Sequence, residues 1–167
     1  MSYKSEWRCT YGILVYMNIS LIEPKTQEDF QKYYQLRWKV LRQPWGQPEG
    51  SEKDELEHQS IHIMACINKE VVGVGRLHFN SSQEAQIRYM AIDEKHNGKG
   101  IGSHILQKLE RRAKKNKASY IVLHARETAI PFYEKNGYSI LEKSHIFFGN
   151  IHHFKMIKNI ISDSIKE

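Results

Sequence analysis

Apolar residues along the chain recur with two different periods, and these periods separate helices from strands. Spacings of three and four residues predict one amphipathic helix after Thr26 and a second from Ile101. Shorter alternating or continuously apolar runs predict strands. In chain order, the predicted elements are a strand over 19–23, a helix over 26–43, strands over 60–67, 71–79 and 84–92, a helix from 101, a strand over 120–125, a short helix over 129–136, and strands over 138–148 and 151–157.

Turn and capping residues lie where these elements should begin and end. Thr26 and Asp29 have the spacing of a capping box, and Pro44 should end the first helix. The tripeptide 68–70 reads as the turn of a hairpin. The segment 43–58 carries two prolines and two glycines among charged residues, which predicts a loop.

The order of the elements predicts the topology of the sheet. The strands over 84–92 and 120–125 are joined by a single helix, so they should be parallel with a right-handed crossover. The remaining strands should be antiparallel. We therefore predict an α/β (α+β) fold, a mixed and mostly antiparallel sheet with helices on its faces. We assign 1–18 to an N-terminal extension of uncertain order, 19–160 to a single domain and 161–167 to a C-terminal tail.

Length and composition indicate the size, the net charge and the cellular compartment of the protein. A chain of 167 residues is long enough for one domain with a buried core. The net charge of +6 favours anionic partners such as nucleic acid, acidic protein or a phosphate-rich cofactor. Only two cysteines occur, which predicts no disulfide framework and a cytoplasmic location. The longest apolar run, 11–17, is too short to cross a bilayer, so no membrane partner is expected.

The most informative local pattern is DEKHNGKGIGSHIL at 93–106. Gly98, Gly100 and Gly102 lie where the second long helix should begin, although each glycine destabilises a helix by about 0.5–1 kcal/mol relative to alanine. The amides of a first helical turn lack intrahelical partners and attract anions, and glycines let a phosphate approach them. Lys99 adds positive charge. The spacing fits neither a P-loop nor a dinucleotide fingerprint, and the competing interpretation is a turn that only joins strand to helix.

Two blocks of the chain have the spacing of known signatures. Gly100 and Gly102 fit Q/R-x-x-G-x-G/A after a strand and at the start of a helix, with Asn97 in the first position. The block AIPFYEKNGY at 129–138 fits A-x-x-F-Y-x-K-x-G-F. Together they resemble the Gcn5-related N-acetyltransferase (GNAT) family, and the resemblance extends over 19–158. Within that family, the chain looks similar to the acetyltransferase half of a bacterial protein fused to a thioesterase-like domain.

The resemblance implies a fold, a co-substrate and a reaction. The implied fold is that of GNAT acyl-CoA N-acyltransferases, in which a central pair of parallel strands splays apart to bind acetyl-CoA (coenzyme A), without a metal. The implied reaction is direct attack of a primary amine on the thioester, with Tyr133 as the general acid for the leaving thiolate. The implied cofactor-binding residues are Met90, Ala91, Ile92, Asn97, Gly98, Lys99, Gly100, Ile101, Gly102, Ser103 and Phe132.

The two blocks do not indicate which residues bind and deprotonate the amine acceptor. An amine with a pKa of about 10 must lose its proton before it attacks, which calls for a base. The candidate bases are Glu52, Asp54, Glu55, His62 and Glu84. We take Glu84 as the catalytic one. The residues predicted to bind the acceptor are Arg37, Trp45 and His62.

Two further patterns do not predict a site. His58 and His62 are four residues apart, but His62 falls in a strand pattern and no cysteine or acidic residue completes a zinc spacing, so no metal is expected. The basic run RRAKKNK at 111–117 lacks the interleaved aromatic residues of single-strand binding, so no nucleic-acid partner is expected.

Several functions remain open from the residues. The first is an N-acetyltransferase acting on the amine of a small molecule or a protein. The second is acyl transfer involving a carrier-protein thioester, and the third is a non-catalytic CoA-binding module. A basic nucleic-acid-binding domain has only the net charge in its favour. The family resemblance also points to a homodimer formed through the late strands.

Overall fold

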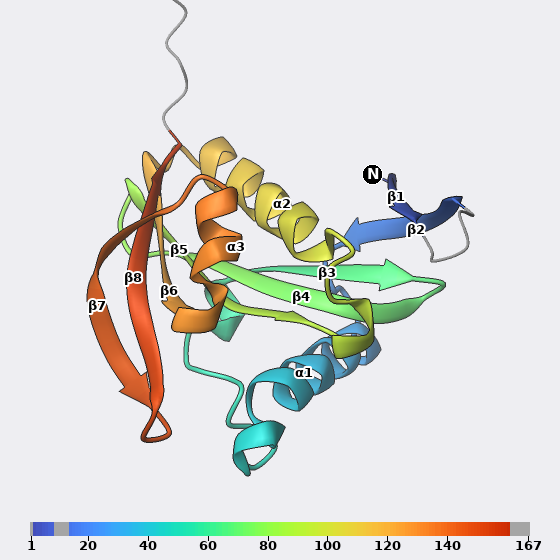
Figure 1. Ribbon diagram of the computed structural model, residues 1–167, viewed down its shortest axis with the longest axis horizontal. Coiled ribbons are helices and arrows are strands. Elements are labelled where there is room, and N and C mark those ends of the chain that lie inside the picture. Colours follow the sequence, from blue (N-terminus) through green and yellow to red (C-terminus); the bar gives the residue numbers. More distant parts are fainter. Residues whose placement is uncertain (1, 9–13, 161–167) are drawn as a thin grey trace, which may run out of the picture. The chain divides into compact units, whose positions relative to one another are not determined.

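The computed structural model describes residues 2–8 and 14–160 (Figure 1). Its strands are hydrogen-bonded in the order β1-β2-β3-β4-β5-β6-β8-β7. The strands are β1 (Ser2–Arg8), β2 (Leu14–Ile22), β3 (Ile61–Ile67), β4 (Glu70–Phe79), β5 (Glu84–Ile92), β6 (Tyr120–Arg126), β7 (Ser139–Phe147) and β8 (Ile151–Asn159). The helices are α1 (Gln27–Leu41), α2 (Ile101–Lys115) and α3 (Ile130–Lys135), with short 3-10 turns η1 (Gln43–Trp45), η2 (Glu57–Gln59), η3 (Glu94–His96) and η4 (Glu127–Ala129).

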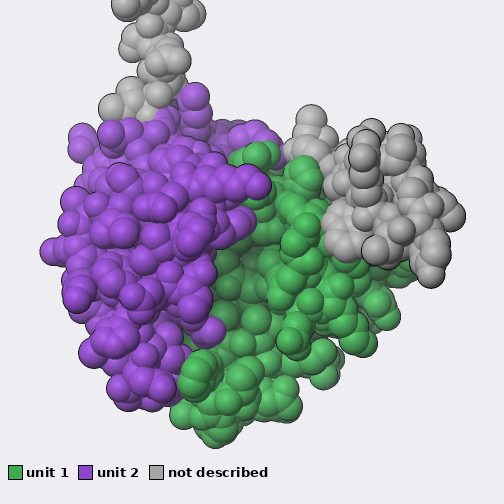
Figure 2. All heavy atoms as spheres, in the orientation of Figure 1, with its two compact units in different colours: residues 1–76, 89–109 green, residues 77–88, 110–167 purple. Residues whose placement is uncertain are grey.

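The chain forms two compact units, which Figure 2 shows in different colours. The first unit comprises residues 1–76 and 89–109, and the second comprises residues 77–88 and 110–167. Strands β4 and β5 and helix α2 therefore each contribute residues to both units. None of the described helices is long and apolar enough to span a membrane.

The N-terminal strands differ from the prediction. Strand β2 begins at Leu14, earlier than the predicted start at Ile19, and β1 pairs antiparallel with it from Ser2↔Ser20 to Arg8↔Leu14. The sequence of β1 has charged and polar residues instead of an apolar run, as is common in edge strands, so periodicity does not reveal it. The assignment of a single domain to 19–160 stays a prediction, and the tail 161–167 lies outside the described residues.

The parallel pair is present where the element order predicts it. Strands β5 and β6 pair in parallel from Glu84↔Tyr120 to Ile87↔Leu123. This register covers only the first part of each strand. Strand β6 pairs antiparallel with β8, which pairs antiparallel with β7. The predicted mixed, mostly antiparallel sheet with a central parallel pair is therefore confirmed.

In the first unit, α1 and α2 cover opposite faces of β3 and β4 (Figure 1). Val74 of β4 joins Tyr33 and Met64 in a cluster under α1. A Cβ added at Gly75 would lie 2.8 Å from Ile105 Cγ2 of α2. Because successive side chains of a strand point to opposite faces, both faces of β4 are covered, and its burial is continuous.

Both long helices follow their sequence signals. Asp29 N donates to Thr26 Oγ1 at 3.1 Å and Thr26 N donates to Asp29 Oδ2 at 3.0 Å, so the predicted capping box is confirmed. Helix α1 ends before Pro44. The apolar stripe of α2 is fully buried: Ile101, Ile105, Leu106, Leu109 and Ala113.

In the second unit, the carboxylate of Glu110 connects α2 to strand β8. Glu110 accepts a hydrogen bond from Tyr138 Oη at 3.1 Å and another from Lys158 Nζ at 2.9 Å. Lys158 Nζ also donates to Asn136 O at 2.9 Å. These bonds fix the turn that follows α3, which carries the second signature block.

Candidate active site

The glycine segment before α2 leaves open space beside its backbone. Gly98 and Gly100 have φ angles of 74° and 77°, a region that residues with a Cβ avoid. A Cβ added at either glycine would meet no atom within 4 Å. Helix α2 begins at Ile101, so both glycines precede the helix and only Gly102 lies inside it. The two glycines therefore provide a left-handed backbone and leave its surface uncovered.

The first turn of α2 follows this open segment directly. Its first helical hydrogen bond runs from His104 N to Gly100 O at 3.2 Å. The amides of Ile101, Gly102 and Ser103 come before that bond, so the helix supplies no acceptor for them. The partial positive charge of a helix N-terminus makes such amides suited to an anion.

The end of β5 lies beside this helix start. A Cβ added at Gly73 would lie 2.9 Å from Ile92 Cδ1 and 3.0 Å from Ile101 Cγ2, so the two isoleucines meet over that glycine. Asp93 N donates to Val72 O at 2.8 Å, which holds the chain as it leaves the strand. The last residues of β5 and the first residues of α2 are thus held together over β4.

Tyr89 has an unusual backbone for a residue inside a strand. Its φ is 57°, whereas the other described non-glycine residues with positive φ lie in turns. The left-handed region costs a residue with a Cβ roughly 1–2 kcal/mol. Tyr89 Oη donates to Asp54 Oδ2 at 3.1 Å. Its ring lies 4.4 Å from the guanidinium carbon of Arg37 and 4.8 Å from that of Arg76.

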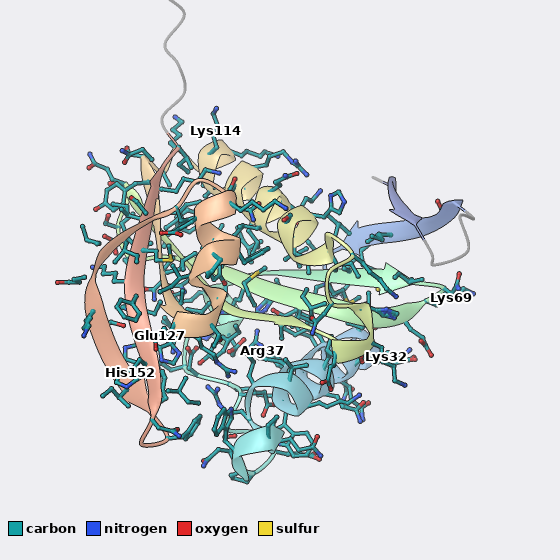
Figure 3. All side chains as sticks on the ribbon, in the orientation of Figure 1. Lys32, Arg37, Lys69, Lys114, Glu127 and His152 are labelled. Carbon is teal, nitrogen blue, oxygen red and sulfur yellow. The ribbon has the colours of Figure 1, made fainter. Side chains whose placement is uncertain are left out.

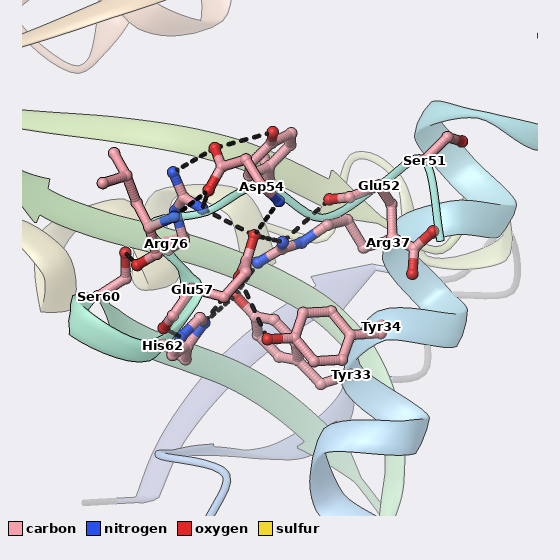
Figure 4. Close-up of polar contacts among 12 residues, drawn as sticks. Tyr33, Tyr34, Arg37, Ser51, Glu52, Asp54, Glu57, Ser60, His62 and Arg76 are labelled. Atoms are coloured by element: carbon pink, nitrogen blue, oxygen red, sulfur yellow. Dashed lines mark hydrogen bonds and ion pairs between the residues drawn. The ribbon is translucent and has the colours of Figure 1, made fainter. Parts of the chain in front are cut away.

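The two arginines belong to a buried ion-pair network (Figure 4). Arg76 donates to both carboxylate oxygens of Asp54, with NH2 to Oδ2 at 2.9 Å, and its NH1 also donates to Glu57 Oε1 at 2.7 Å. Arg37 NH1 donates to the same oxygen of Glu57 at 2.8 Å. Both guanidinium groups have no exposed surface, and two carboxylates balance their two charges. Such burial is tolerated because every charge has an opposite partner.

The network sets the protonation of Asp54. Burial alone would raise its pKa, but hydrogen bonds from Arg76 and from the Leu56 amide outweigh burial and hold the pKa of Asp54 well below its usual range. For Arg76, burial lowers the pKa, and the hydrogen bond to Asp54 and the charge of Glu57 raise it above its usual value. Asp54 is therefore a carboxylate at neutral pH and a poor proton acceptor.

His62 and Tyr33 extend the network as neutral groups. His62 Nε2 lies 2.8 Å from Glu57 O, which can only accept, so this nitrogen carries the proton. Burial is the main cause that lowers the pKa of His62. Its unprotonated Nδ1 lies 3.2 Å from Tyr33 Oη. That hydroxyl accepts from Arg37 NH2 at 2.8 Å and donates to Gly75 O at 3.1 Å. Burial raises the pKa of Tyr33 to about 12.

In the second unit, Tyr133 is buried on α3. Its ring contacts Phe132 at 5.0 Å and Tyr138 at 5.8 Å, edge to face. Burial raises the pKa of Tyr133, and the charge of Arg126 offsets this only in part. Among the described residues, no group hydrogen-bonds its hydroxyl.

Comparison with known proteins decides the family. The family model for the Acetyltransferase (GNAT) family matches residues 30–138. A Bacillus subtilis (strain 168) protein, Uncharacterized N-acetyltransferase YjcF, is 30% identical over 135 residues, which are 81% of this chain and 96% of that protein. The chain belongs to the acetyltransferase (GNAT) family. It is therefore an acetyltransferase, as predicted.

Solved GNAT structures share the fold. Aminoglycoside 6'-N-acetyltransferase complexed with coenzyme A superposes with a TM-score of 0.71 at 17% identity, covering 86% of this chain and 97% of that one. A GNAT family acetyltransferase from Elizabethkingia anophelis with acetyl-CoA bound gives 0.67 at 19% identity, covering 84% and 97%. The GNAT fold of the chain is confirmed. The likeness to a fusion with a thioesterase-like domain stays a prediction.

The predicted cofactor-binding residues of this GNAT chain fall in both units. Met90, Ala91 and Ile92 end β5, and residues 97–103 run from the first residue after η3 into the first turn of α2. Ala91 and Ile101 are buried, so only their backbone is available to a ligand. Phe132 lies in the second unit with Tyr133.

The predicted acceptor-binding residues are not gathered at one surface. Arg37 of α1 is fully buried (Figure 3), and His62 is 7% exposed. Tyr33 links these two side chains. Trp45 ends η1 and is 38% exposed. The acceptor role of these three residues stays a prediction.

Glu84, the predicted base, begins β5 in the second unit. Its carboxylate accepts from Asn80 Nδ2 at 2.6 Å and from Tyr120 Oη at 3.0 Å. The hydrogen bond to Glu84 is the main cause that raises the pKa of Tyr120. Among residues 2–8 and 14–160, no group of three His, Cys, Asp or Glu side chains is placed to hold a metal ion.

Sequence reasoning missed three residues of the site. Arg76 is the charged residue in an otherwise apolar strand, VVGVGRLHF, and such a position signals a buried partner. Glu57 ends a charged loop in which no carboxylate stands out from the others. The sequence does not reveal the left-handed backbone of Tyr89, because the position holds neither glycine nor asparagine, the residues that adopt a positive φ most readily.

Proposed function

We propose that the chain transfers an acetyl group from acetyl-CoA to a primary amine of a small molecule or a protein. The observation that carries the proposal is the open, left-handed backbone at Gly98 and Gly100 before the amides of α2. A pyrophosphate needs an uncovered backbone with amide donors and positive charge, and this segment offers these properties. The net charge of +6 favours an anionic co-substrate of this kind.

The residues fit coenzyme A along two stretches of the first unit. The amides from Gly98 to Ser103, with Asn97 and Lys99, would hold the pyrophosphate. The backbone of Met90, Ala91 and Ile92 would pair with the pantetheine arm. In the second unit, Phe132 completes the proposed set. Relatives of known structure have coenzyme A or acetyl-CoA bound, which supports the proposal by likeness.

The chemistry needs a proton donor, and we assign that role to Tyr133. Acetyl-CoA supplies an activated thioester: the amine nitrogen forms a bond to the carbonyl carbon, and the carbon–sulfur bond breaks. The leaving thiolate then takes a proton. Because burial raises the pKa of Tyr133, its phenol stays protonated at neutral pH, which is the form a general acid requires.

Glu84 is the proposed base that removes the proton of the amine. Its two oxygens each accept one hydrogen bond, from Asn80 and from Tyr120. A carboxylate can accept about four, so each oxygen keeps a lone pair for a water or an amine.

Location, acceptor and assembly belong to the same proposal. The two cysteines support a cytoplasmic location. Arg37, Trp45 and His62 are the residues proposed for the acceptor, and the family resemblance supports a homodimer.

The proposal is tested by measuring transfer itself. The purified protein is incubated with acetyl-CoA and a panel of primary amines, and free thiol and acetylated amine are both quantified. Equal amounts of the two products are expected for at least one amine, above the rate of thioester hydrolysis without amine. Binding of acetyl-CoA without any acetylated product would contradict the proposal and favour a non-catalytic CoA-binding module.

A further inference from the structure

Tyr89 contacts Asp54, Arg37 and Arg76, and of these only Arg37 has a place in the proposed function; the guanidinium carbon of Arg42 lies farther from the Tyr89 ring, at 5.7 Å. Asp54 accepts a hydrogen bond from its hydroxyl, and the guanidinium groups of Arg37 and Arg76 lie against its ring. Both guanidinium carbons are within the 6 Å or so at which a cation attracts an aromatic face. We name Arg37, Arg76 and Asp54 the Tyr89 clamp.

The clamp itself is rigid. Arg76 engages both carboxylate oxygens of Asp54, and Arg37 is bonded to Glu57 and to Tyr33. Neither arginine has exposed side-chain surface. Tyr89 cannot change its ring position without breaking these contacts, because both its ring and its hydroxyl are engaged.

The backbone of Tyr89 determines the direction of the residues after it. A left-handed residue inside a strand turns the following peptide groups, as a β-bulge does. The residues that follow are Met90, Ala91 and Ile92, which end β5. A tyrosine has no intrinsic preference for φ of 57°, so the side-chain contacts must keep it there.

We propose that the Tyr89 clamp positions the backbone of Met90 to Ile92 for acyl-CoA. The inference rests on the proposed function, because it needs those peptide groups to contact the acyl-pantetheine arm. Tyr89, Arg37, Arg76 and Asp54 are then positioning residues, and none of them touches the reacting atoms. Arg37 has a role here that requires no contact with the acceptor.

The decisive comparison is Tyr89→Ala with Tyr89→Gly. Both variants lose the ring and the hydroxyl, so they leave the same cavity. Only glycine adopts a positive φ without a Cβ penalty. We expect Tyr89→Ala to bind coenzyme A more weakly than Tyr89→Gly by roughly 5- to 30-fold, the Cβ penalty of the left-handed region expressed as an equilibrium constant. The KM for acetyl-CoA should follow the same order.

A matched pair of controls separates this effect from general strain. Lys69 has φ of 67°, is exposed, and lies in the turn before β4 (Figure 3). Lys69→Ala and Lys69→Gly should differ in thermal stability and bind coenzyme A equally. Equal affinities of Tyr89→Ala and Tyr89→Gly, with wild-type binding intact, would overturn the inference and leave the proposed function standing. No binding by the wild type would overturn both.

A milder variant and a ligand-free measurement cover the case in which the truncated proteins do not fold. Tyr89→Phe keeps the ring and removes the hydroxyl that donates to Asp54. We expect faster amide hydrogen exchange at Met90 to Ile92 and a coenzyme A affinity lowered by roughly 3- to 10-fold. Unchanged exchange and unchanged affinity in a folded Tyr89→Phe would overturn the inference.

Discussion

Arg76 and Asp54 form a two-point ion pair in which the arginine has no exposed side-chain surface, with NH2 donating to Oδ2 at 2.9 Å. The pair joins β4 to the loop that precedes η2. Glu57, the first residue of η2, adds a second carboxylate. These ion pairs join a loop with two prolines and two glycines to the core, together with hydrogen bonds from Arg37 and Trp38 to the loop backbone.

We expect Asp54→Ala to lower the free energy of unfolding by about 3–5 kcal/mol, because it leaves the buried guanidinium of Arg76 without its main partner. Urea denaturation at pH 7 measures the change. Glu49→Ala removes an exposed carboxylate from the same loop and should alter stability by less than about 0.5 kcal/mol.

The same pair predicts a pH dependence. The pKa of Asp54 is lower in the folded protein than the value of 3.8 expected when unfolded. Its stabilisation is therefore complete above that pH and is lost as the pH falls below it. The Asp54→Asn variant should lose less stability than the wild type between pH 5 and about pH 2. Parallel losses in both proteins would show that Asp54 is not held as a carboxylate.

Gly73→Ala should destabilise the first unit by about 1–3 kcal/mol through overpacking. The added Cβ would lie 2.8 Å from Ile105 Cδ1 and close to Ile92 and Ile101. The Ile105→Val variant removes that Cδ1 atom and costs about 0.5–1.5 kcal/mol by itself. The double variant should lose less stability than the two single variants lose together, because the Cδ1 atom that the new Cβ would meet is gone. A loss equal to that sum would contradict the close packing at Gly73. Thermal unfolding of the four proteins completes the cycle.

Tyr133→Phe should lower kcat by roughly 100- to 10,000-fold, the usual contribution of a general acid, and leave the affinity for coenzyme A unchanged. Tyr138→Phe is the matched control. It removes the hydroxyl of a neighbouring buried tyrosine that donates to Glu110, so it should cost about 1 kcal/mol of stability and leave kcat unchanged. Equal kcat values for Tyr133→Phe and wild type would remove Tyr133 from the reaction.

Two histidines of the second unit, His124 and His145, should make the protein sensitive to mild acid. The rings of His145 and His153 stack at 4.8 Å, and His124 lies 5.1 Å from His145. Burial lowers the pKa of His124 and of His145, and the charges of Arg88 and Lys155 add to the effect on His124. Because the folded pKa is below the unfolded value of 6.5, their stabilisation is complete above pH 6.5 and is lost as the pH falls below it.

His145→Phe should keep the ring contacts and flatten this loss of stability between pH 7 and pH 5. His62 of the first unit also has a lowered pKa and contributes its own loss of stability in acid. The stability of the variant is therefore compared with that of the wild type at each pH. The exposed His58 is the control, since His58→Gln should reproduce the wild-type profile. A wild-type profile in His145→Phe would contradict the account of the cluster.

Much of the fold could be predicted because local signals agreed with tertiary packing. The stripe from Ile101 to Ala113 has helical spacing and is buried throughout, and the parallel pair follows from the helix that joins its strands. The glycines were recognised as an exception to helix propensity. Their left-handed backbone depends on the path of the chain into α2, which no propensity describes.

The polar interior could not be predicted from the sequence. Arg37 is predicted to hold an acidic group of the acceptor, and no pattern in the sequence marks Arg37 or His62 as buried. Their burial depends on Glu57, whose carboxylate accepts from Arg37 and whose backbone oxygen accepts from His62. The left-handed backbone of Tyr89 has the same origin, since contacts with Arg37, Arg76 and Asp54 hold it.

The most direct test of the central claim is calorimetric titration of acetyl-CoA into the wild type, Gly100→Glu and Gly46→Glu. Gly46 has φ of 66° and open space around it, so both variants carry the same backbone strain and the same new charge. The account predicts binding by the wild type and by Gly46→Glu, and no binding by a folded Gly100→Glu, whose carboxylate would repel the pyrophosphate. Equal binding by all three proteins, or no binding by the wild type, would contradict it.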